Sequence, residues 1–410
     1  MLKYYLNIHL VNRNLVKVAL LKAEQNNFLN GGANFSFKWN SGSDKTKQES
    51  FSKLEKTLNK LPENSHLITN VILDDSIFDD LLVTKSVTKL SKNELNYETF
   101  DAKEIQRFLQ SRMESINIVD DSKFYVHYTY MYTIEEKDKL KGDVLKVYKN
   151  FPNNKSFDVL SQHSTIYQFS KNNLTFIKLQ HFLLKFNLQN DINYFFRSQV
   201  IANSLRDQKK LTFLVDLSND YLLMSTVLFG KVVDYKKLAV GTAGLIEKIK
   251  RVTGLRTDEI MSRFNYIDRY TNNKLTKYET DNNLIHFKRA LDVLVDRINT
   301  VIKLQIAHLC DVNGGKIITK IAFSGELAWL VEYLMHHFNS KNEYELMKIT
   351  DSNKFSFTYL TDKMVERTIL MLEGDEKQEQ AQTQTNQVYL QKNSKYTLFS
   401  KIKEFLYKGA

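Results

Sequence analysis

The fold of this chain is decided by the stretch Leu211-Thr-Phe-Leu-Val-Asp216-Leu-Ser-Asn-Asp220. Its apolar run predicts a buried strand that ends in a carboxylate and a polar turn, and two further strand patterns, Leu222–Leu228 and Lys231–Leu238, follow at once. A carboxylate at the end of a buried strand can order a metal-bound water beside a phosphate. The same residues also suit an ordinary turn rich in Ser, Asn and Asp, so both interpretations stay open.

Two short turns further along the chain each join a predicted strand to a predicted helix. The first, Val240-Gly-Thr-Ala-Gly244, opens a helix pattern over Gly241–Val252. The second, Phe323-Ser-Gly-Glu326, links the strand pattern Ile317–Phe323 to the helix pattern Glu326–Phe338. Backbone N–H groups at a helix start suit an anion, although such turns are also common as plain connections.

The rest of the chain is predicted to alternate strands and helices, with a polar loop at Glu135–Lys141, and this order indicates an α/β protein. Strand patterns cover Lys3–Leu10, Val16–Lys22, Leu67–Leu73, Leu82–Leu90, Phe124–Ile134 and Asp158–Ser170. Helix patterns cover Glu49–Leu61, Phe100–Ile116, Leu174–Leu188, Ile192–Leu205, Thr257–Phe264, Ile285–Leu309 and Met364–Leu372.

The composition narrows the classes of partner. A formal net charge of +11 favours an anionic partner, but no basic motif interleaved with aromatic residues indicates nucleic acid. The single cysteine, Cys310, excludes an internal disulfide framework and fits a reducing compartment. No run of 18 apolar residues occurs, so we expect no membrane span. The nine histidines show no metal-ligand spacing, so we expect no metal site built on them.

The end of the chain changes character twice. Gly374–Asn393 is rich in Gln, Thr and Glu and poor in apolar residues, which predicts a disordered linker with a reach of about 25 Å. Helical periodicity then returns over Ser394–Lys408.

This last segment predicts an amphipathic helix. Its apolar residues fall on one arc, its lysines lie mostly on the other, and this is the pattern of a helix lying in a membrane interface. The alternatives to membrane binding are that the helix docks on a protein partner or on the chain's own body. The membrane-binding residues are Leu398, Phe399, Lys401, Ile402, Lys403, Phe405, Leu406 and Lys408.

The order of these pieces resembles FtsA, the actin-like bacterial division protein that tethers FtsZ filaments to the membrane. The stretch Leu6-Asn-Ile-His-Leu10 looks like the first phosphate hairpin, with Asn7 and His9 for the Asp and Gly of Asp-Ile-Gly-Thr. The helix pattern Asn193–Leu205, followed by the strand that keeps the family's carboxylate at Asp216, is similar to the Gln-Pro-Leu-Ala-Ser helix and the second phosphate strand.

The remaining matches depart from the family at glycine positions. Ser218, Asn219 and Asp220 stand where the second phosphate turn has three glycines. The turn at Gly241 matches a Val-Gly-Gly turn with Thr242 at the second glycine. The resemblance implies that the nucleotide-binding residues include these and the counterparts of the adenosine-binding Glu-x-x-Lys helix and Leu-Thr-Gly-Gly turn: Asn7, Asp216, Ser218, Asn219, Gly241, Thr242, Glu259, Arg263, Ser324 and Gly325.

The resemblance implies an actin-like (ribonuclease H-like) two-lobed ATPase fold of the α/β class, with an inserted small α+β domain that is SHS2-like. The implied parts are lobe 1 at 1–75 and 169–210, the inserted domain at 76–168, lobe 2 at 211–254 and 301–373, a small lobe at 255–300, the linker at 374–393 and the amphipathic helix at 394–410.

The resemblance also implies a site for ATP with Mg²⁺. A side chain at a glycine position restricts φ and blocks the close approach of a phosphate. Asn7 removes a negative charge that contributes to the magnesium site. We therefore expect a degenerate ATPase in which hydrolysis is lost, and we assign no catalytic residue.

The implied partners are the membrane, the FtsZ C-terminal peptide and further copies of the chain in actin-like filaments, at the cytoplasmic face of the division site. The peptide is expected on the small lobe at Arg256, Arg263, Lys288 and Arg289, and a solvated basic face is the alternative. An actin- or Hsp70-like ATPase with an active nucleotide cycle and a PilM-like binding module are the rival functions.

Overall fold

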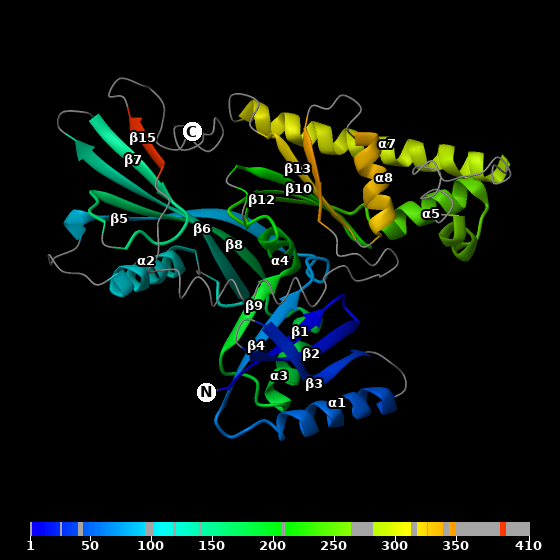
Figure 1. Ribbon diagram of the computed structural model, residues 1–410, viewed down its shortest axis with the longest axis horizontal. Helices are drawn as coiled ribbons and strands as arrows, with labels where there is room; N and C mark the ends of the chain where they lie inside the picture. Colours follow the sequence, from blue (N-terminus) through cyan, green and yellow to red (C-terminus); the bar gives the residue numbers. More distant parts are fainter. Residues whose placement is uncertain are drawn as a thin grey trace. The chain divides into compact units, whose positions relative to one another are not determined.

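The computed structural model of the chain describes two compact units (Figure 1). Unit 1 takes the described residues of Met1–Ile134 and Tyr148–Asn203, and unit 2 those of Glu135–Val147, Ser204–Thr361 and Thr385–Ala410. The described residues are 2–24, 27–39, 44–94, 102–117, 120–138, 142–153, 155–206, 208, 210–263, 282–312, 318–325, 327–338, 344–349 and 386–390.

A five-stranded sheet in the order β3-β2-β1-β4-β9 forms the centre of unit 1. The first three strands run antiparallel as a meander, and β4 and β9 then run parallel to β1. The strands are β1 (Leu2–Leu10), β2 (Leu15–Glu24), β3 (Asn27–Lys38), β4 (Ser65–Leu73) and β9 (Ile192–Phe196).

Unit 2 is built around a second five-stranded sheet, in the order β12-β11-β10-β13-β14. Here too an antiparallel meander of three strands is followed by two parallel strands. The strands are β10 (Thr212–Leu217), β11 (Leu222–Leu228), β12 (Lys231–Leu238), β13 (Lys320–Gly325) and β14 (Glu345–Lys348).

The two sheets therefore have the same strand order and the same strand directions. This duplicated, ribonuclease H-like topology is that of the actin-like fold, and the predicted fold class is confirmed. In each unit the parallel strands are joined through helices, because a parallel connection needs a crossover. The carboxyl ends of the central parallel strands lie at one edge of each sheet, which is where such sheets place functional groups.

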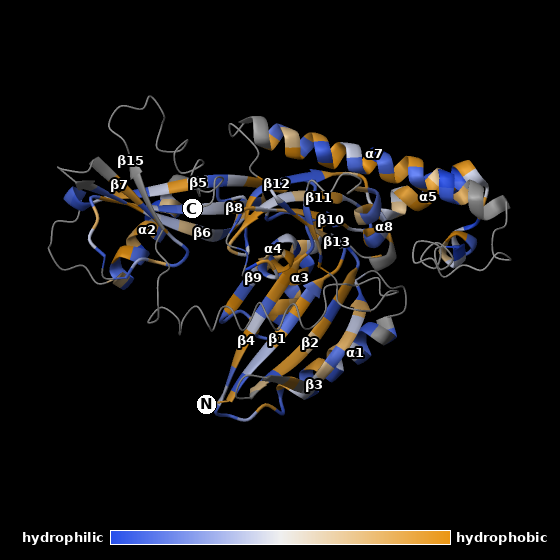
Figure 2. Ribbon diagram, turned by 45° about the horizontal axis from the view of Figure 1, so that its top comes forward, coloured by the Kyte–Doolittle hydropathy of each residue, from blue (hydrophilic) through white to orange (hydrophobic). Residues whose placement is uncertain are grey.

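Helices pack on the sheets, in which β10 and β11 are buried along their whole length, and Figure 2 shows hydrophobic residues along several of the strands. In unit 1, Phe182 of α3 packs against Phe37, Trp39 and Phe51. In unit 2, Phe323 of β13 contacts Phe338 at a ring-centroid distance of 5.7 Å. The covering helices are α1 (Asp44–Leu58), α3 (Leu174–Lys185), α4 (Arg197–Asn203), α5 (Thr242–Thr253), α7 (Asn282–Val312) and α8 (Ala328–Phe338).

A small α+β domain is inserted in the sequence between β4 and α3. Its sheet has the order β15-β7-β6-β8-β5, in which β15 comes from a segment after α8 and the other four strands from the insertion. The helix α2 (Ala102–Asn117) closes a core that contains Leu109, Ile134 and Leu160. The strands are β5 (Leu82–Ser91), β6 (Lys123–Asp138), β7 (Gly142–Tyr148), β8 (Val159–Ser170) and β15 (Asn386–Leu390), and a 3-10 turn η1 (Lys92–Glu94) follows β5.

Several predicted elements differ from the observed ones. The helix predicted over Ile192–Leu205 is wrong for its first five residues, which form β9 because they pair in parallel with β4. The loop predicted at Glu135–Lys141 begins inside β6, which continues to Asp138. Within the predicted linker the structure differs at β15, which pairs with β7.

Two predicted helices, Met364–Leu372 and the amphipathic segment Ser394–Lys408, lie outside the described residues. Among the helices that are described, none combines the length and the apolar character that a bilayer span requires.

Candidate functional site

Seven of the predicted site residues gather in unit 2 where β10 and β13 end and α5 begins. The register places Asp216 opposite Ser324 and Leu217 opposite Gly325 on neighbouring parallel strands. Asp216 is fully buried, and the buried hydroxyl of Ser324 makes no hydrogen bond with any described residue. The sequence therefore identified the place in the fold, although what these residues do there depends on their hydrogen bonds.

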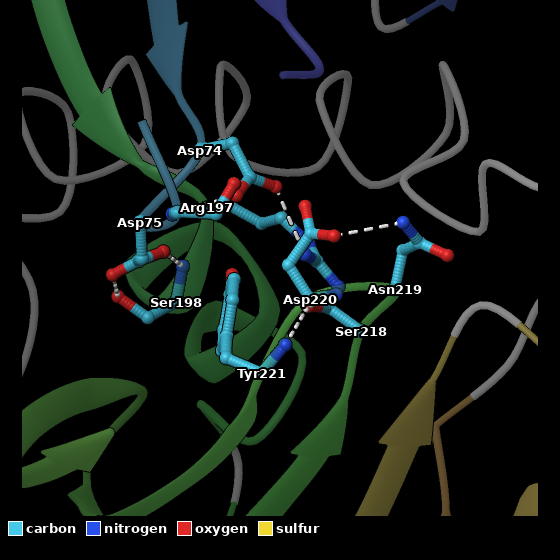
Figure 3. A network of polar contacts seen from close by, with 9 residues as sticks. Asp74, Asp75, Arg197, Ser198, Ser218, Asn219, Asp220 and Tyr221 are labelled. Carbon is cyan, nitrogen blue, oxygen red and sulfur yellow. Dashed lines mark hydrogen bonds and ion pairs between the residues drawn. The ribbon is translucent and has the colours of Figure 1, made fainter. Parts of the chain in front are cut away.

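The turn between β10 and β11 is closed by its own atoms (Figure 3). The N–H of Ser218 donates to the carbonyl oxygen of Tyr221 at 3.0 Å. The hydroxyl oxygen of Ser218 accepts from the N–H of Asp220 at 3.4 Å and of Tyr221 at 3.3 Å. The side chain of Asn219 donates to Asp220 at 2.9 Å. These donors of the turn are therefore engaged within the chain itself.

The start of α5 lies directly against this turn. The N–H of Thr242 donates to the carbonyl oxygen of Ser218 at 2.8 Å, and the N–H of Ala243 donates to that of Asn219 at 3.0 Å. A Cβ atom on Gly241 would lie 2.1 Å from the carbonyl oxygen of Asn219, so only glycine permits this approach. The free N–H groups of a helix start are thereby partly satisfied by the turn.

Gly325 also has a packing role. A Cβ atom there would lie 2.7 Å from Cγ2 of Val331 and 2.9 Å from the carbonyl oxygen of Leu217. The glycine that the sequence matched to an adenosine turn thus lets α8 and β10 approach β13 closely.

Glu259 and Arg263, predicted to contact adenosine, lie on a short helix at 257–263. The carboxylate of Glu259 accepts from the N–H of Arg256 at 2.7 Å and lies 3.7 Å from Nε of the same residue. This is the arrangement of a helix N-terminal cap, which leaves Glu259 with a local structural role.

In unit 1, Asn7 belongs to a ladder of asparagines across three parallel strands. Asn70 of β4 donates from Nδ2 to Oδ1 of Asn7 at 3.0 Å, and Asn193 of β9 donates to Oδ1 of Asn70 at 3.1 Å. The register pairs the three residues directly. Asn7 and Asn70 are buried, and their amides satisfy each other. Asn7 therefore links β1 to β4 as the acceptor of this side-chain hydrogen bond.

His9, at the second departure from the first phosphate motif, is buried near the end of β1. Burial lowers the pKa of its imidazole from 6.5 to about 3, so the ring is neutral at pH 7. Its Nε2 atom has no hydrogen-bond partner among the described residues. A ring now fills the position at which the family has a glycine.

Beyond β4 lies a buried ionic cluster that the sequence analysis did not identify (Figure 3). Nη1 of Arg197, the first residue of α4, lies 2.9 Å from Oδ2 of Asp74. The neighbouring Asp75 accepts from the N–H of Ser198 at 3.0 Å and from its hydroxyl at 2.8 Å. Burial, and next the negative charge of Asp74, raise the pKa of Asp75 from 3.8 to about 6. In the sequence, this cluster was indicated only by Asp74 and Asp75, which directly follow the predicted strand Leu67–Leu73.

The turn between β1 and β2 is closed in the same way as the one in unit 2. Oδ1 of Asn12 accepts from the N–H of Asn14 at 2.9 Å and of Leu15 at 2.8 Å. The N–H of Val11 donates to the carbonyl oxygen of Leu15 at 3.0 Å. Arg13, at the tip of the turn, forms an exposed ion pair with Asp79.

The residues present do not fit a magnesium nucleotide of the kind the fold family implies. In both turns and at the start of α5, several backbone N–H groups, among them those of Leu15, Tyr221 and Thr242, donate to oxygens of the chain itself. The described part of the chain also holds no group of three or more His, Cys, Asp or Glu side chains placed to bind a metal ion. No catalytic step is therefore assigned to these residues.

The four basic residues predicted to bind a partner lie on or beside two helices of unit 2. Arg256 pairs with Asp258 at 3.5 Å and with Glu259, yet its side chain is 75% exposed. Lys288 of α7 pairs with Asp292 at 2.9 Å, and its neighbour Arg289 is exposed. Part of the positive charge is thus balanced within the chain.

Acid is expected to destabilise unit 1, because the buried imidazoles of His9 and His163 stay neutral while the unfolded chain protonates. Burial lowers the pKa of His163 from 6.5 to about 4. For both histidines the stability is present above pH 6.5 and is lost as the pH falls. Asp75 acts in the opposite sense, since its raised pKa gives stability below pH 6 that increases down to about pH 3.8. Relative to pH 7, the two histidines lower the free energy of unfolding at pH 4.5 by roughly 5 kcal/mol, and Asp75 raises it by about 2 kcal/mol. The net loss is about 3 kcal/mol.

Urea unfolding between pH 4.5 and 7 measures this loss. The variant His163→Asn is expected to remove about half of the histidine contribution to the slope. His181 is exposed on α3, so His181→Asn serves as the control and should leave the profile unchanged. A stability that rises toward pH 4.5 would contradict the burial of the two neutral rings.

Comparisons with known proteins show likeness at the level of the fold. Neither the family models nor the curated proteins give a match to the sequence. Among solved structures, a PilM–PilN type IV pilus biogenesis complex is 8% identical over 84% of this chain and 88% of that chain, with a TM-score of 0.44. A Bacteroides thetaiotaomicron protein with an actin-like ATPase fold and unknown function is 9% identical over 84% and 90%, with a TM-score of 0.32.

A third solved structure is the ethanolamine utilization protein EutJ from Carboxydothermus hydrogenoformans, 8% identical over 84% of each chain, with a TM-score of 0.37. Identities this low concern the fold alone. The assignment of the actin-like fold depends on the strand order of the two sheets.

Proposed function

We propose that this chain is an FtsA-like scaffold that holds FtsZ filaments at the cytoplasmic face of the membrane through its last helix. The observation that carries the proposal is the sequence of Ser394–Lys408, whose apolar arc and lysines follow an actin-like body with an inserted α+β domain. The tail itself lies outside the described residues. Its pattern is that of a helix in the plane of a membrane interface.

The expected strength of membrane binding is modest for one chain. Full burial of the five apolar side chains would contribute roughly 8–15 kcal/mol, and partial insertion about half of that. Each lysine near anionic lipid adds about 1 kcal/mol. Folding a short helix offsets much of this gain, because such a helix is marginal alone in water. One tail therefore binds reversibly, and a filament that carries many tails binds far more tightly through effective concentration.

The basic residues of unit 2 support an acidic peptide as the partner. Arg256 and Arg289 are exposed, Arg263 and Lys288 are partly exposed, and the net charge of the whole chain is +11. An acidic segment from the C-terminus of FtsZ would complement such a surface, mainly by raising the rate of association. The side chain of Arg256 is 75% exposed in its pair with Asp258, whereas Lys288 is 30% exposed in its pair with Asp292.

The tail is tested by sedimentation of the full chain with anionic vesicles. Leu398→Glu combined with Phe405→Glu places two charges on the apolar arc and is expected to reduce the bound fraction at least about tenfold. Binding of the unmodified chain should fall as salt is raised, because part of the attraction is between lysines and lipid headgroups.

The matched control adds the same two charges to the polar face, as Thr397→Glu combined with Ser400→Glu. This variant should lose only the electrostatic part of the binding. Equal losses in both variants would show that charge and not insertion decides binding. Sedimentation unchanged by the first variant would remove the tether from the proposal and leave a protein partner for the helix.

A further inference from the structure

The described structure has three places at which backbone donors or a cation could receive an anion, and each already holds an acceptor from the chain. They are the β1–β2 turn, the β10–β11 turn together with the start of α5, and the start of α4. The acceptors are Oδ1 of Asn12, the hydroxyl and carbonyl oxygens of Ser218 and Asn219, and the carboxylates of Asp74 and Asp75.

The two hairpin turns lie in separate units, and in each of them backbone N–H groups already donate to an oxygen of the chain. In each turn one side-chain oxygen accepts from two backbone N–H groups that follow it: Asn12 from Asn14 and Leu15, and Ser218 from Asp220 and Tyr221. A glycine at either position has no such oxygen. Ser218, which stands at a glycine position of the second phosphate motif, therefore does more than obstruct a phosphate, since its hydroxyl oxygen is itself an acceptor for backbone N–H groups.

At the start of α4, the carboxylates of Asp74 and Asp75 also balance positive charge, in addition to accepting hydrogen bonds. The carboxylate of Asp75 accepts from the N–H of Ser198, the second residue of α4. Asp74 balances the guanidinium of Arg197 in the same buried region. An added phosphate would meet two carboxylates there, and a magnesium ion would meet the arginine.

We infer that both units fold completely without a nucleotide, with Asn12 and Ser218 as internal substitutes for the phosphate oxygens. A magnesium nucleotide would have to break these hydrogen bonds before it formed its own, so the exchange offers little net gain. The inference concerns nucleotide independence and does not depend on the membrane tail, so either can fail without the other.

The first test is thermal unfolding of the full chain with ATP and Mg²⁺. A nucleotide present at a hundred times its Kd would raise the unfolding midpoint by roughly 5 °C or more. The expected result is no shift at millimolar ATP and Mg²⁺. A rise of that size would overturn the inference.

The second test is amide hydrogen exchange, which examines the turn itself. Without nucleotide, the amides of Thr242 and Ala243 should be protected, and ATP with Mg²⁺ should leave them unchanged. In Ser218→Ala the amides of Asp220 and Tyr221 should exchange about fivefold faster.

Ser225→Ala is the matched control on β11, because the buried hydroxyl of Ser225 has no hydrogen-bond partner among the described residues. Exchange in the turn should be the same in this variant as in the unmodified chain. Slower exchange at Thr242 and Ala243 with nucleotide, or no effect of Ser218→Ala, would contradict the internal-acceptor role.

Discussion

Arg197→Met is expected to lower the free energy of unfolding of unit 1 by about 3–5 kcal/mol, because it leaves the carboxylate of Asp74 buried without its cation. The side chains of Arg197 and Asp74 are only 3% and 5% exposed, so water cannot replace the lost partner. Methionine keeps most of the apolar stem of arginine, so the loss reports the charge. Urea unfolding followed by Trp39 fluorescence measures it, in a Trp329→Phe background that leaves a single tryptophan.

Two variants show whether the loss comes from the unpaired charge. Asp74→Asn combined with Arg197→Met removes both charges and should recover a large part of the stability. Arg13→Met breaks an ion pair with Asp79 whose side chains are 57% and 83% exposed, and it should cost at most about 1 kcal/mol. If Arg197→Met costs no more than Arg13→Met, the buried pair does not stabilise unit 1.

Gly241→Ala is expected to destabilise unit 2 by about 3 kcal/mol or more, since the added methyl group has no space. Its carbon would lie 2.1 Å from the carbonyl oxygen of Asn219 and 2.5 Å from the carbonyl carbon of Asp220. These are backbone atoms, so α5 and the β10–β11 turn must separate. The hydrogen bonds from Thr242 and Ala243 to the turn would then be lost as well.

Gly244→Ala provides the control within the same helix. A Cβ atom on Gly244 meets no heavy atom within 4 Å, and alanine is the better helix former, so this variant should gain about 0.5–1 kcal/mol. Urea unfolding followed by Trp329 fluorescence compares the two variants. A stabilising Gly241→Ala would show that the helix start and the turn do not lie as close as described.

The fold could be predicted where local pattern and tertiary structure agree. The meander β10–β11–β12 follows from strand patterns separated by short turns, the first of them an apolar run, and the long helix predicted at Ile285–Leu309 lies within α7. The pattern misled at Ile192–Phe196, where an apolar run directly before a helix has the same local composition as a helical turn. Only pairing with β4, more than a hundred residues away in the sequence, makes it a strand.

The candidate site could be located from the sequence, but its hydrogen bonds could not. Asp216, Ser218, Gly241 and Ser324 meet at one sheet edge as their places between strands and helices predict. The partnership of Asp74 with Arg197 joins residues 123 positions apart, and nothing local in either residue indicates the other. Ser218 was evident as a side chain at a glycine position, whereas its use as an acceptor for two N–H groups depends on the turn geometry.

The most direct measurement is flotation of FtsZ filaments with anionic vesicles in the presence of this chain. With the unmodified chain, FtsZ should rise with the vesicles, and the variant carrying Leu398→Glu and Phe405→Glu should leave FtsZ in the bulk solution while still binding it. FtsZ that floats equally well with that variant, or vesicles that carry this chain without FtsZ, would contradict an actin-like body that joins a filament to a membrane.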